Sequence, residues 1–203
     1  MTAYVYPAVS HSRKHAPKGY AHYRQYRPWL RDEFAFRCVY CLTRERWGKG
    51  RYGFHVDHLI PQAKDPSRIL DYDNLVYACA TCNSIKRDKE AIPDPCQVAY
   101  GECLKVTDDG KIEALNGHGR ILIERLSLDN EENTEYRKQM LEIIRWAESQ
   151  NPHRYVQLMG FPDDLPDLDT YQPPDNSRLE GVEQSWFAKR KRGVLPETYQ
   201  RRQ

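Results

Sequence analysis

Two Cys-x-x-Cys pairs, at residues 38–41 and 79–82, constrain this chain more than any other feature. Each pair brings two thiolates close enough to share one ion, and two pairs together complete a tetrahedral zinc site. A redox pair or chance is the alternative for a single Cys-x-x-Cys, whereas two pairs favour zinc. We therefore predict a closed four-thiolate site that stabilises the fold and takes no part in chemistry. Its ligands are Cys38, Cys41, Cys79 and Cys82.

The composition predicts a small apolar core, which a bound metal would help to stabilise. Of the 203 residues, 39% are hydrophobic and 30% are charged, and the mean hydropathy is −0.85. No apolar run approaches the roughly 20 residues that span a bilayer, and the N-terminus lacks a signal-peptide pattern. We therefore expect a cytoplasmic protein without a membrane segment, in which paired cysteines bind metal. For Cys96 and Cys103, which lie outside this pattern, we expect buried or free thiols.

The charges are segregated along the chain, although the net charge is only +2. Residues 1–31 contain six Lys and Arg and no acid, interleaved with Tyr and Trp, and residues 189–192 are all basic. Basic ends with aromatic side chains suit a polyanion, because cations neutralise phosphates and rings stack on bases. Solvated termini without a ligand are the alternative, but beside the central motif we favour nucleic acid.

The elements expected around the cysteines follow the order strand, strand, helix. Residue patterns predict strands over 54–60 and 75–77 and a helix over about 80–89. Asn83 and Lys86 would then lie on one face of this helix, three positions apart.

Beyond residue 92 the sequence predicts an α+β extension. Asp109-Gly110 indicates the turn of a hairpin over 105–113. A longer helix is expected over about 131–149, between a cap at Asn130 or a neighbouring residue and a stop at Asn151-Pro152. The apolar stripe of this helix, expected to pack on the core, is Tyr136, Met140, Ile143, Ile144 and Ala147. The expected segments are a basic aromatic arm at 1–27, a metal-stabilised core at 28–92, the extension at 93–159, and an acidic Pro-rich linker with a basic tail at 160–203.

The central residues resemble the HNH endonuclease family. The matching motifs are Val-Asp-His-Leu-Ile-Pro at 56–61, Asp-Asn-Leu at 73–75 and Cys-x-x-Cys-Asn-x-x-Lys at 79–86. Each motif alone is common, whereas their order and spacing are specific. The resemblance implies the α+β class with a ββα-metal core, a divalent ion and hydrolysis of nucleic-acid phosphodiesters. The motif ends in Asn83 rather than His, so Mg²⁺ or Mn²⁺ suits the site better than zinc.

The chemistry of these residues predicts a role for each. His58 is the expected general base, since imidazole accepts a proton near neutrality. Asp57 and Asn83 are expected to hold the catalytic ion at the scissile phosphate. Asn74 matches the family's middle Asn and would orient the imidazole or its loop, with a turn cap as the alternative. Lys86 is expected to contact a phosphate oxygen, unless it is an ordinary solvated lysine.

The resemblance also implies the partners. DNA is the expected substrate, with RNA left open, because the family mostly cuts DNA. The basic loop after the first Cys pair is expected to face it, through Arg44, Arg46, Lys49 and Arg51. The extension resembles stand-alone HNH proteins of bacterial anti-phage modules, which implies an ATPase partner, and a phage-borne or homing nuclease is the alternative. One site nicks one strand, so a double-strand break would require a homodimer or successive events.

A non-catalytic zinc-ribbon module that binds nucleic acid or protein is the rival interpretation. It would use the four cysteines and the basic ends. Asp57, His58 and Asn83 together would serve no purpose in it, and they therefore favour the enzyme.

Overall fold

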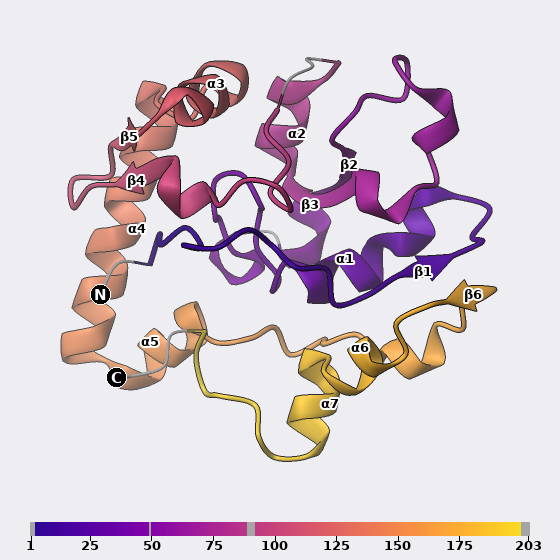
Figure 1. Ribbon diagram of the computed structural model, residues 1–203. Coiled ribbons are helices and arrows are strands. Elements are labelled where there is room, and N and C mark those ends of the chain that lie inside the picture. Colours follow the sequence, from indigo (N-terminus) through magenta and orange to yellow (C-terminus); the bar gives the residue numbers. More distant parts are fainter. Residues whose placement is uncertain (1–2, 49, 89–91, 200–203) are drawn as a thin grey trace.

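The computed structural model describes residues 3–48, 50–88 and 92–199, and its centre is a ββα unit (Figure 1). Strands β2 (Phe54–His58) and β3 (Leu75–Cys79) are antiparallel, and α2 (Ala80–Lys86) follows β3 directly. The register places Phe54 opposite Cys79 and His58 opposite Leu75. Helix α1 (Arg27–Glu33) packs against β3. The predicted order of strand, strand and helix is confirmed, and the fold is of the α+β class.

The extension lies to one side of this unit (Figure 1). It consists of a hairpin, β4 (Leu104–Val106) with β5 (Ile112–Ala114), and of α3 (Gly117–Leu126), α4 (Glu131–Gln150) and α5 (Pro152–Met159). The hairpin turn contains Gly110 at φ +83°, as the Asp-Gly pair predicts. The Asn130 side chain caps α4 by accepting a hydrogen bond from the Asn133 N–H at 2.7 Å. The hairpin and the longer helix are therefore confirmed, whereas α3 was not predicted.

The buried face of α4 differs from the predicted stripe. Met140, Ile144 and Ala147 are buried as expected, but Tyr136 is 37% exposed and Ile143 is 44% exposed. Arg137 and Leu141 take their place on the buried face. The helix is therefore rotated slightly from the orientation that its apolar residues alone predict.

The C-terminal segment runs back past α1 (Figure 1). Its β6 (Asp175–Asn176) pairs with β1 (Pro17–Lys18), and α6 (Glu180–Glu183) and α7 (Trp186–Lys191) follow. Short 3-10 helices occupy the connections: Tyr23–Tyr26, Glu45–Trp47, Gly50–Gly53, Pro66–Arg68, Tyr72–Asn74, Tyr100–Glu102 and Leu168–Thr170. Among the helices of the described ranges, none combines the length and the apolarity that crossing a bilayer requires.

The larger of two hydrophobic clusters among the described residues extends from Ala3 to Leu168, so the predicted arm, ββα unit and extension share it, and a smaller cluster contains Phe36, Phe161 and Leu165. Tyr4, Tyr6 and Tyr26 belong to the larger cluster and are at most 5% exposed. The prediction that the aromatic rings of the arm stack on bases is therefore wrong for these three residues. They are apolar packing residues, because the chain supplies few aliphatic side chains for the core.

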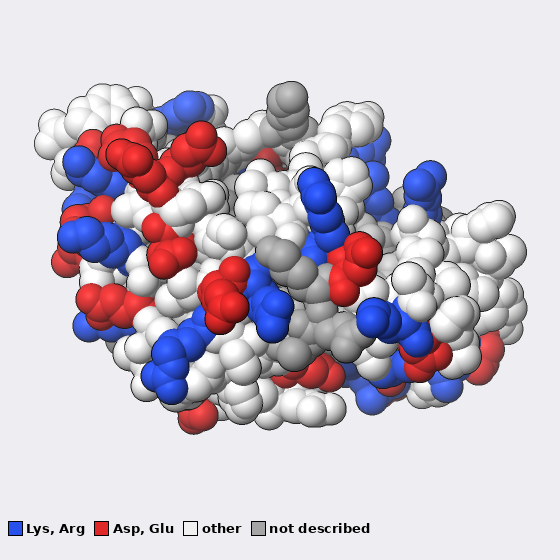
Figure 2. Space-filling view, turned by 90° about the horizontal axis from the view of Figure 1, so that it is seen from above, with Lys and Arg blue, Asp and Glu red and all other residues white. Residues whose placement is uncertain are grey.

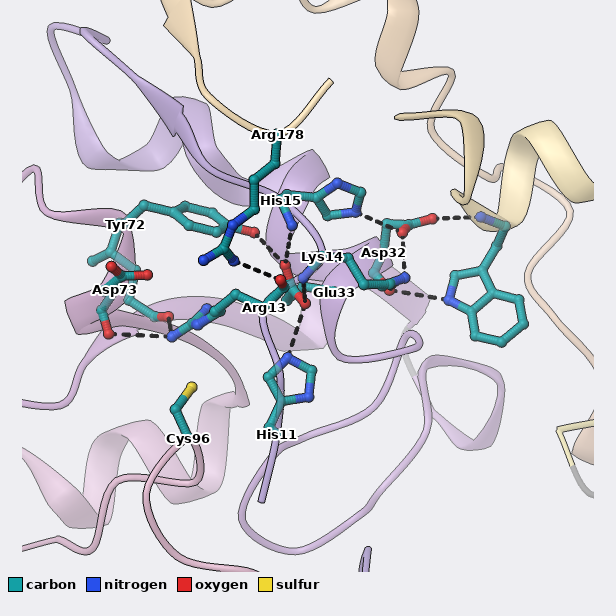
Figure 3. Close-up of polar contacts among 12 residues, drawn as sticks. His11, Arg13, Lys14, His15, Asp32, Glu33, Tyr72, Asp73, Cys96 and Arg178 are labelled. Atoms are coloured by element: carbon teal, nitrogen blue, oxygen red, sulfur yellow. Dashed lines mark hydrogen bonds and ion pairs between the residues drawn. The ribbon is translucent and has the colours of Figure 1, made fainter. Parts of the chain in front are cut away.

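Two carboxylates at the end of α1 fasten both terminal segments to the core (Figure 3). Glu33 accepts hydrogen bonds from the backbone N–H of His15 at 3.0 Å and from the Tyr72 hydroxyl at 3.2 Å. Asp32 accepts hydrogen bonds from His15 Nε2 at 2.8 Å and from the Trp186 N–H at 2.7 Å. Both carboxylates are buried, so these donors satisfy charges that water does not reach.

Candidate metal centre and active-site groove

The four predicted cysteine ligands form one cluster. Their sulfur atoms all lie within 4.8 Å of one another, and Cys41 Sγ lies 3.6 Å from Cys79 Sγ. All four are free thiols. A tetrahedral zinc ion with Zn–S bonds of about 2.3 Å places its sulfurs about 3.8 Å apart. The spacing of the thiols therefore fits zinc.

Local backbone geometry brings the two halves of this cluster together. In the first pair, Leu42 adopts φ +61° and its N–H donates to the Cys38 carbonyl at 3.0 Å, which closes a tight turn. In the second pair, Cys79 is the N-cap of α2, and its Sγ accepts a hydrogen bond from the Cys82 N–H at 3.4 Å. Hydrogen bonds from Cys38 and the other thiols hold the pKa of Cys41 well below its usual range. A thiolate, the form that binds metal, is therefore favoured in this cluster.

Asp57, His58 and Asn83 line one groove of about 520 Å³. Asp57 and His58 end β2, and Asn83 lies in α2, one residue after Cys82. Asp57 and His58 are each 6% exposed, and Asn83 is half-buried. The structure thus brings the three residues of the predicted catalytic set to one site.

Neighbouring groups fix the orientation of the His58 imidazole. Its Nε2 lies 3.1 Å from the Ile69 carbonyl oxygen, which can only accept a hydrogen bond. Nε2 therefore carries the proton, and Nδ1 is the acceptor, with Gln62 Nε2 at 3.3 Å. The Tyr23 ring meets the imidazole edge-on at a centroid distance of 4.8 Å. Burial lowers the pKa of His58 below its usual value, so the ring is neutral near neutral pH.

Asn74 holds the loop that follows His58. Its Oδ1 accepts from the Ile60 N–H at 2.8 Å, and its Nδ2 donates to the carbonyls of Ile60 at 3.1 Å and Arg68 at 3.2 Å. The side chain is 1% exposed. Arg68 directly precedes Ile69, whose carbonyl binds the imidazole. Of the two roles expected for Asn74, these contacts fit the orientation of the loop.

Lys86 is buried against Asp57 and is not available to a phosphate. It is 0% exposed, and its Nζ lies 3.2 Å from Asp57 Oδ1 and donates to the His58 carbonyl. Asp57 Oδ2 accepts a hydrogen bond from the Tyr40 hydroxyl at 2.7 Å. Burial raises the pKa of Asp57, although Lys86 and Tyr40 oppose this shift. The predicted phosphate contact of Lys86 is therefore corrected, because the last turn of α2 directs it inward as a counter-ion.

The groove offers oxygen ligands that fit a hard divalent ion. Each carboxylate oxygen accepts in two directions, so Asp57 holds Tyr40 and Lys86 and still has lone pairs for a cation. Asn83 adds a neutral amide oxygen on the same groove. Carboxylate and amide oxygens are ligands that suit Mg²⁺ and Mn²⁺. The ammonium of Lys86 beside the carboxylate weakens cation binding at this site.

Arg44 does not face a surface ligand, contrary to the prediction for the basic loop. It is 3% exposed, and its guanidinium packs 4.1 Å from the Tyr199 ring centroid and 5.5 Å from that of Trp47. Tyr199 of the C-terminal segment covers the Arg44 guanidinium, and the sequence around Arg44 does not predict this contact.

The other arginines of the basic loop contact the chain around residue 160. Arg46 donates to the carbonyls of Gln157 at 2.6 Å and Phe161 at 2.8 Å. Arg51 forms an ion pair with Asp164 at 3.0 Å, and its side chain is 46% exposed. Lys49 lies outside the described residues. Of the described arginines in this loop, Arg51 is the most accessible to a nucleic acid.

Three residues that shape the site were not predicted. Tyr40 lies between the first two cysteines, Gln62 follows the Asp-His strand, and Tyr23 comes from the N-terminal arm. The sequence around Tyr40 contains no pattern that predicts its hydrogen bond to Asp57. Long-range packing, rather than any motif, brings these side chains to the groove.

A strand pair followed by a helix, with a four-thiol cluster and a polar groove, defines a ββα unit with a candidate metal centre. Residues 38–89, which contain this unit, match the HNH endonuclease family. The chain therefore carries an HNH endonuclease domain, as the motifs predicted. No curated protein matches the chain.

Proposed function

We propose that this protein is a metal-dependent endonuclease that hydrolyses phosphodiester bonds of DNA, with His58 as the general base. The observation that carries the proposal is the neutral imidazole of His58 on the same groove as the oxygen ligands Asp57 and Asn83. The match of residues 38–89 to a nuclease family supports the same chemistry.

The proposed mechanism assigns a separate task to each residue. His58 Nδ1 accepts the proton of the attacking water, which takes the place of the Gln62 amide on that nitrogen, while the Ile69 carbonyl stabilises the resulting imidazolium through Nε2. Asn74 keeps that carbonyl in place through its contact with Arg68. A divalent ion, Mg²⁺ or Mn²⁺, held by Asp57 and Asn83 would neutralise charge on the scissile phosphate and the leaving oxygen.

The cysteine cluster is proposed to hold zinc and to support the groove through the first turn of α2. Four thiolates would hold zinc there without an open position, so it would supply stability alone. Cys79 and Cys82 flank the first turn of α2, and Asn83 follows at once. Metal binding by these cysteines would thus fix the helix that presents Asn83 to the groove.

The biological setting is proposed from the resemblance alone. An anti-phage role with an ATPase partner rests on the likeness of residues 93–159 to stand-alone HNH proteins, and a homodimer rests on the need to cut two strands. RNA is the alternative substrate. These proposals are independent of the chemistry assigned to His58.

Nicking of a supercoiled plasmid with Mg²⁺ or Mn²⁺ tests the activity. We expect cleavage by the wild type and a loss of about 10²–10⁴-fold in His58→Ala. His55→Ala is the matched control, because His55 lies on the same strand and is exposed. A wild type that cuts neither DNA nor RNA with any divalent ion would contradict the proposal, and nucleic-acid binding without cleavage would support the zinc-ribbon alternative.

A further inference from the structure

Arg87, the first residue after α2, has a backbone conformation that favours glycine. Its dihedral angles are φ +46° and ψ −124°. This region resembles the first central position of a type II′ turn, which Gly, Asn and Asp dominate. Residues held in such regions cluster at functional sites, where the surrounding structure maintains the strain. An arginine at this position therefore calls for an explanation other than local propensity.

The side chain of Arg87 lines the same groove as His58, Asp57 and Asn83. Its N–H donates to the Asn83 carbonyl at 3.2 Å, and its Nε donates to the Ser84 carbonyl at 3.1 Å. The residue is exposed. These two bonds hold the guanidinium beside the groove and leave its two terminal nitrogens for another ligand.

The charge of Arg87 lacks a carboxylate partner within residues 3–48, 50–88 and 92–199. Asp88 also lines the groove but forms no ion pair with Arg87 there. Lys86, by contrast, is fully buried and neutralised by Asp57. Acidic and basic side chains are interspersed on the face that carries the end of α2 (Figure 2). Among the residues that the structure describes, this side has no uniformly basic face to attract an anion (Figure 2), so a single well-placed cation matters more.

We propose that Arg87 binds a phosphate of the nucleic-acid backbone in the groove, in the role that the sequence assigned to Lys86. This inference rests on the proposed nuclease function. With Nε held by Ser84, the two terminal nitrogens present the planar fork that pairs with two phosphate oxygens. The strained backbone places the guanidinium at the groove, whereas a residue in helical conformation would continue α2 past it.

Replacing Arg87 by Gly tests the proposal, because stability and binding are expected to change in opposite directions. Arg87→Gly keeps the N–H that bonds to Asn83 and relieves the strain, so we expect its Tm to rise by about 2–4 °C. Affinity for a DNA duplex, measured in the His58→Ala background to prevent cleavage, is expected to fall about tenfold or more. The slope of log affinity against log salt is expected to decrease by about 0.9.

Two further variants separate a specific contact from loss of charge. Arg145→Gln removes the same charge from α4, where Arg145 pairs with Asp108, and we expect DNA affinity to change less than twofold. Arg87→Lys keeps the charge without the fork, so the salt slope is expected to persist while affinity falls.

Unchanged DNA affinity in Arg87→Gly would overturn the proposal. A fall in both Tm and affinity would overturn it as well, because that result indicates a structural role. If the His58→Ala protein binds neither DNA nor RNA and the wild type does not cut, the proposed function fails together with this inference. If the wild type cleaves and the DNA affinity of Arg87→Gly is unchanged, only the proposed Arg87 contact is refuted.

Discussion

The cysteine cluster and the groove both use residues of helix α2, yet they are organised differently. The cluster has four donors of one kind, all within 4.8 Å, and three of them are buried. The groove has three kinds of donor, and different neighbours hold Asp57 and His58 in place. A set of identical ligands is recognisable from spacing alone. An open site depends on groups that hold its ligands, and those groups come from distant parts of the chain.

The largest effect is expected from breaking the cluster. In Cys79→Ser we expect loss of zinc and unfolding of the ββα unit, because structural zinc contributes about 10–16 kcal/mol to the folding of small zinc domains. Metal analysis and thermal unfolding by circular dichroism measure the two outcomes. The expected content of the wild type is about one zinc per chain.

Cys96→Ser is the matched control for this substitution. Cys96 is a half-buried free thiol outside the cluster, so its loss should leave zinc content unchanged. His58→Ala should also retain the zinc. A Cys79→Ser protein that keeps its zinc would refute the four-thiolate assignment.

Removing the buried cation of the groove is expected to have the next largest effect. Lys86→Met leaves the Asp57 carboxylate buried without its counter-charge, and such a loss costs about 3–5 kcal/mol. Denaturant unfolding measures it. The deficit should shrink at acidic pH, because protonation of Asp57 removes the unpaired charge.

The double variant Asp57→Asn, Lys86→Met is the control, since it removes both charges and should recover part of the lost stability. If Lys86 contacted a phosphate instead, Lys86→Met would keep its stability and lose only nucleic-acid affinity. That outcome would contradict the assignment of Lys86 as a buried counter-ion and of Arg87 as the phosphate contact.

Local signals predicted the elements that depend on local interactions. The strands, α2, the hairpin and the Asn130 cap of α4 follow from patterns within a few residues. Helix α3 was missed because Gly117 and Gly119 lower its helix propensity. Gly119 is required by packing, since a Cβ there would lie 2.0 Å from the Cys103 carbonyl oxygen. This contact joins α3 to a segment that precedes it by more than ten residues, and no local pattern contains it.

Contacts between residues far apart in the sequence also explain why the predictions for Lys86 and Arg44 were wrong. A lysine or arginine is expected at the surface, because burying an unpaired charge is costly. Lys86 is buried because Asp57 neutralises it, and Arg44 is buried under the Tyr199 ring. In each case the compensating group is about 30 or more residues away, so its presence is not visible in the sequence around the cation. The ligand types were predictable, whereas the groups that orient them were not.

A moderate effect is expected from loosening the loop that orients His58. Asn74→Ala leaves the N–H and carbonyl of Ile60 without their partner, which costs about 1–3 kcal/mol for each group that stays buried. The Ile69 carbonyl would then hold the imidazole less firmly, so we expect kcat to fall while KM changes little. Single-turnover cleavage and denaturant unfolding measure the two effects.

Asn74→Asp separates orientation from stability. An aspartate accepts from the Ile60 N–H but cannot donate to the Ile60 and Arg68 carbonyls when ionised. We expect it to lose kcat as Asn74→Ala does. Full activity in either variant would show that the loop holds its position without Asn74.

The smallest effect expected is the pH dependence of cleavage. Burial lowers the pKa of His58 below 6.5, although the Ile69 hydrogen bond and Asp57 oppose the shift. The neutral imidazole is the active form, so the cleavage rate should rise with pH through an inflection below 6.5 and be level above about pH 7. Tyr23→Ala removes the ring that packs against the imidazole, and the resulting hydration should move the inflection upward. Zinc content should stay constant over the same pH range, which would assign the inflection to the groove rather than to the cysteine cluster. An inflection above 6.5 in the wild type, or one that follows zinc loss, would contradict the assignment of His58 as a buried neutral base.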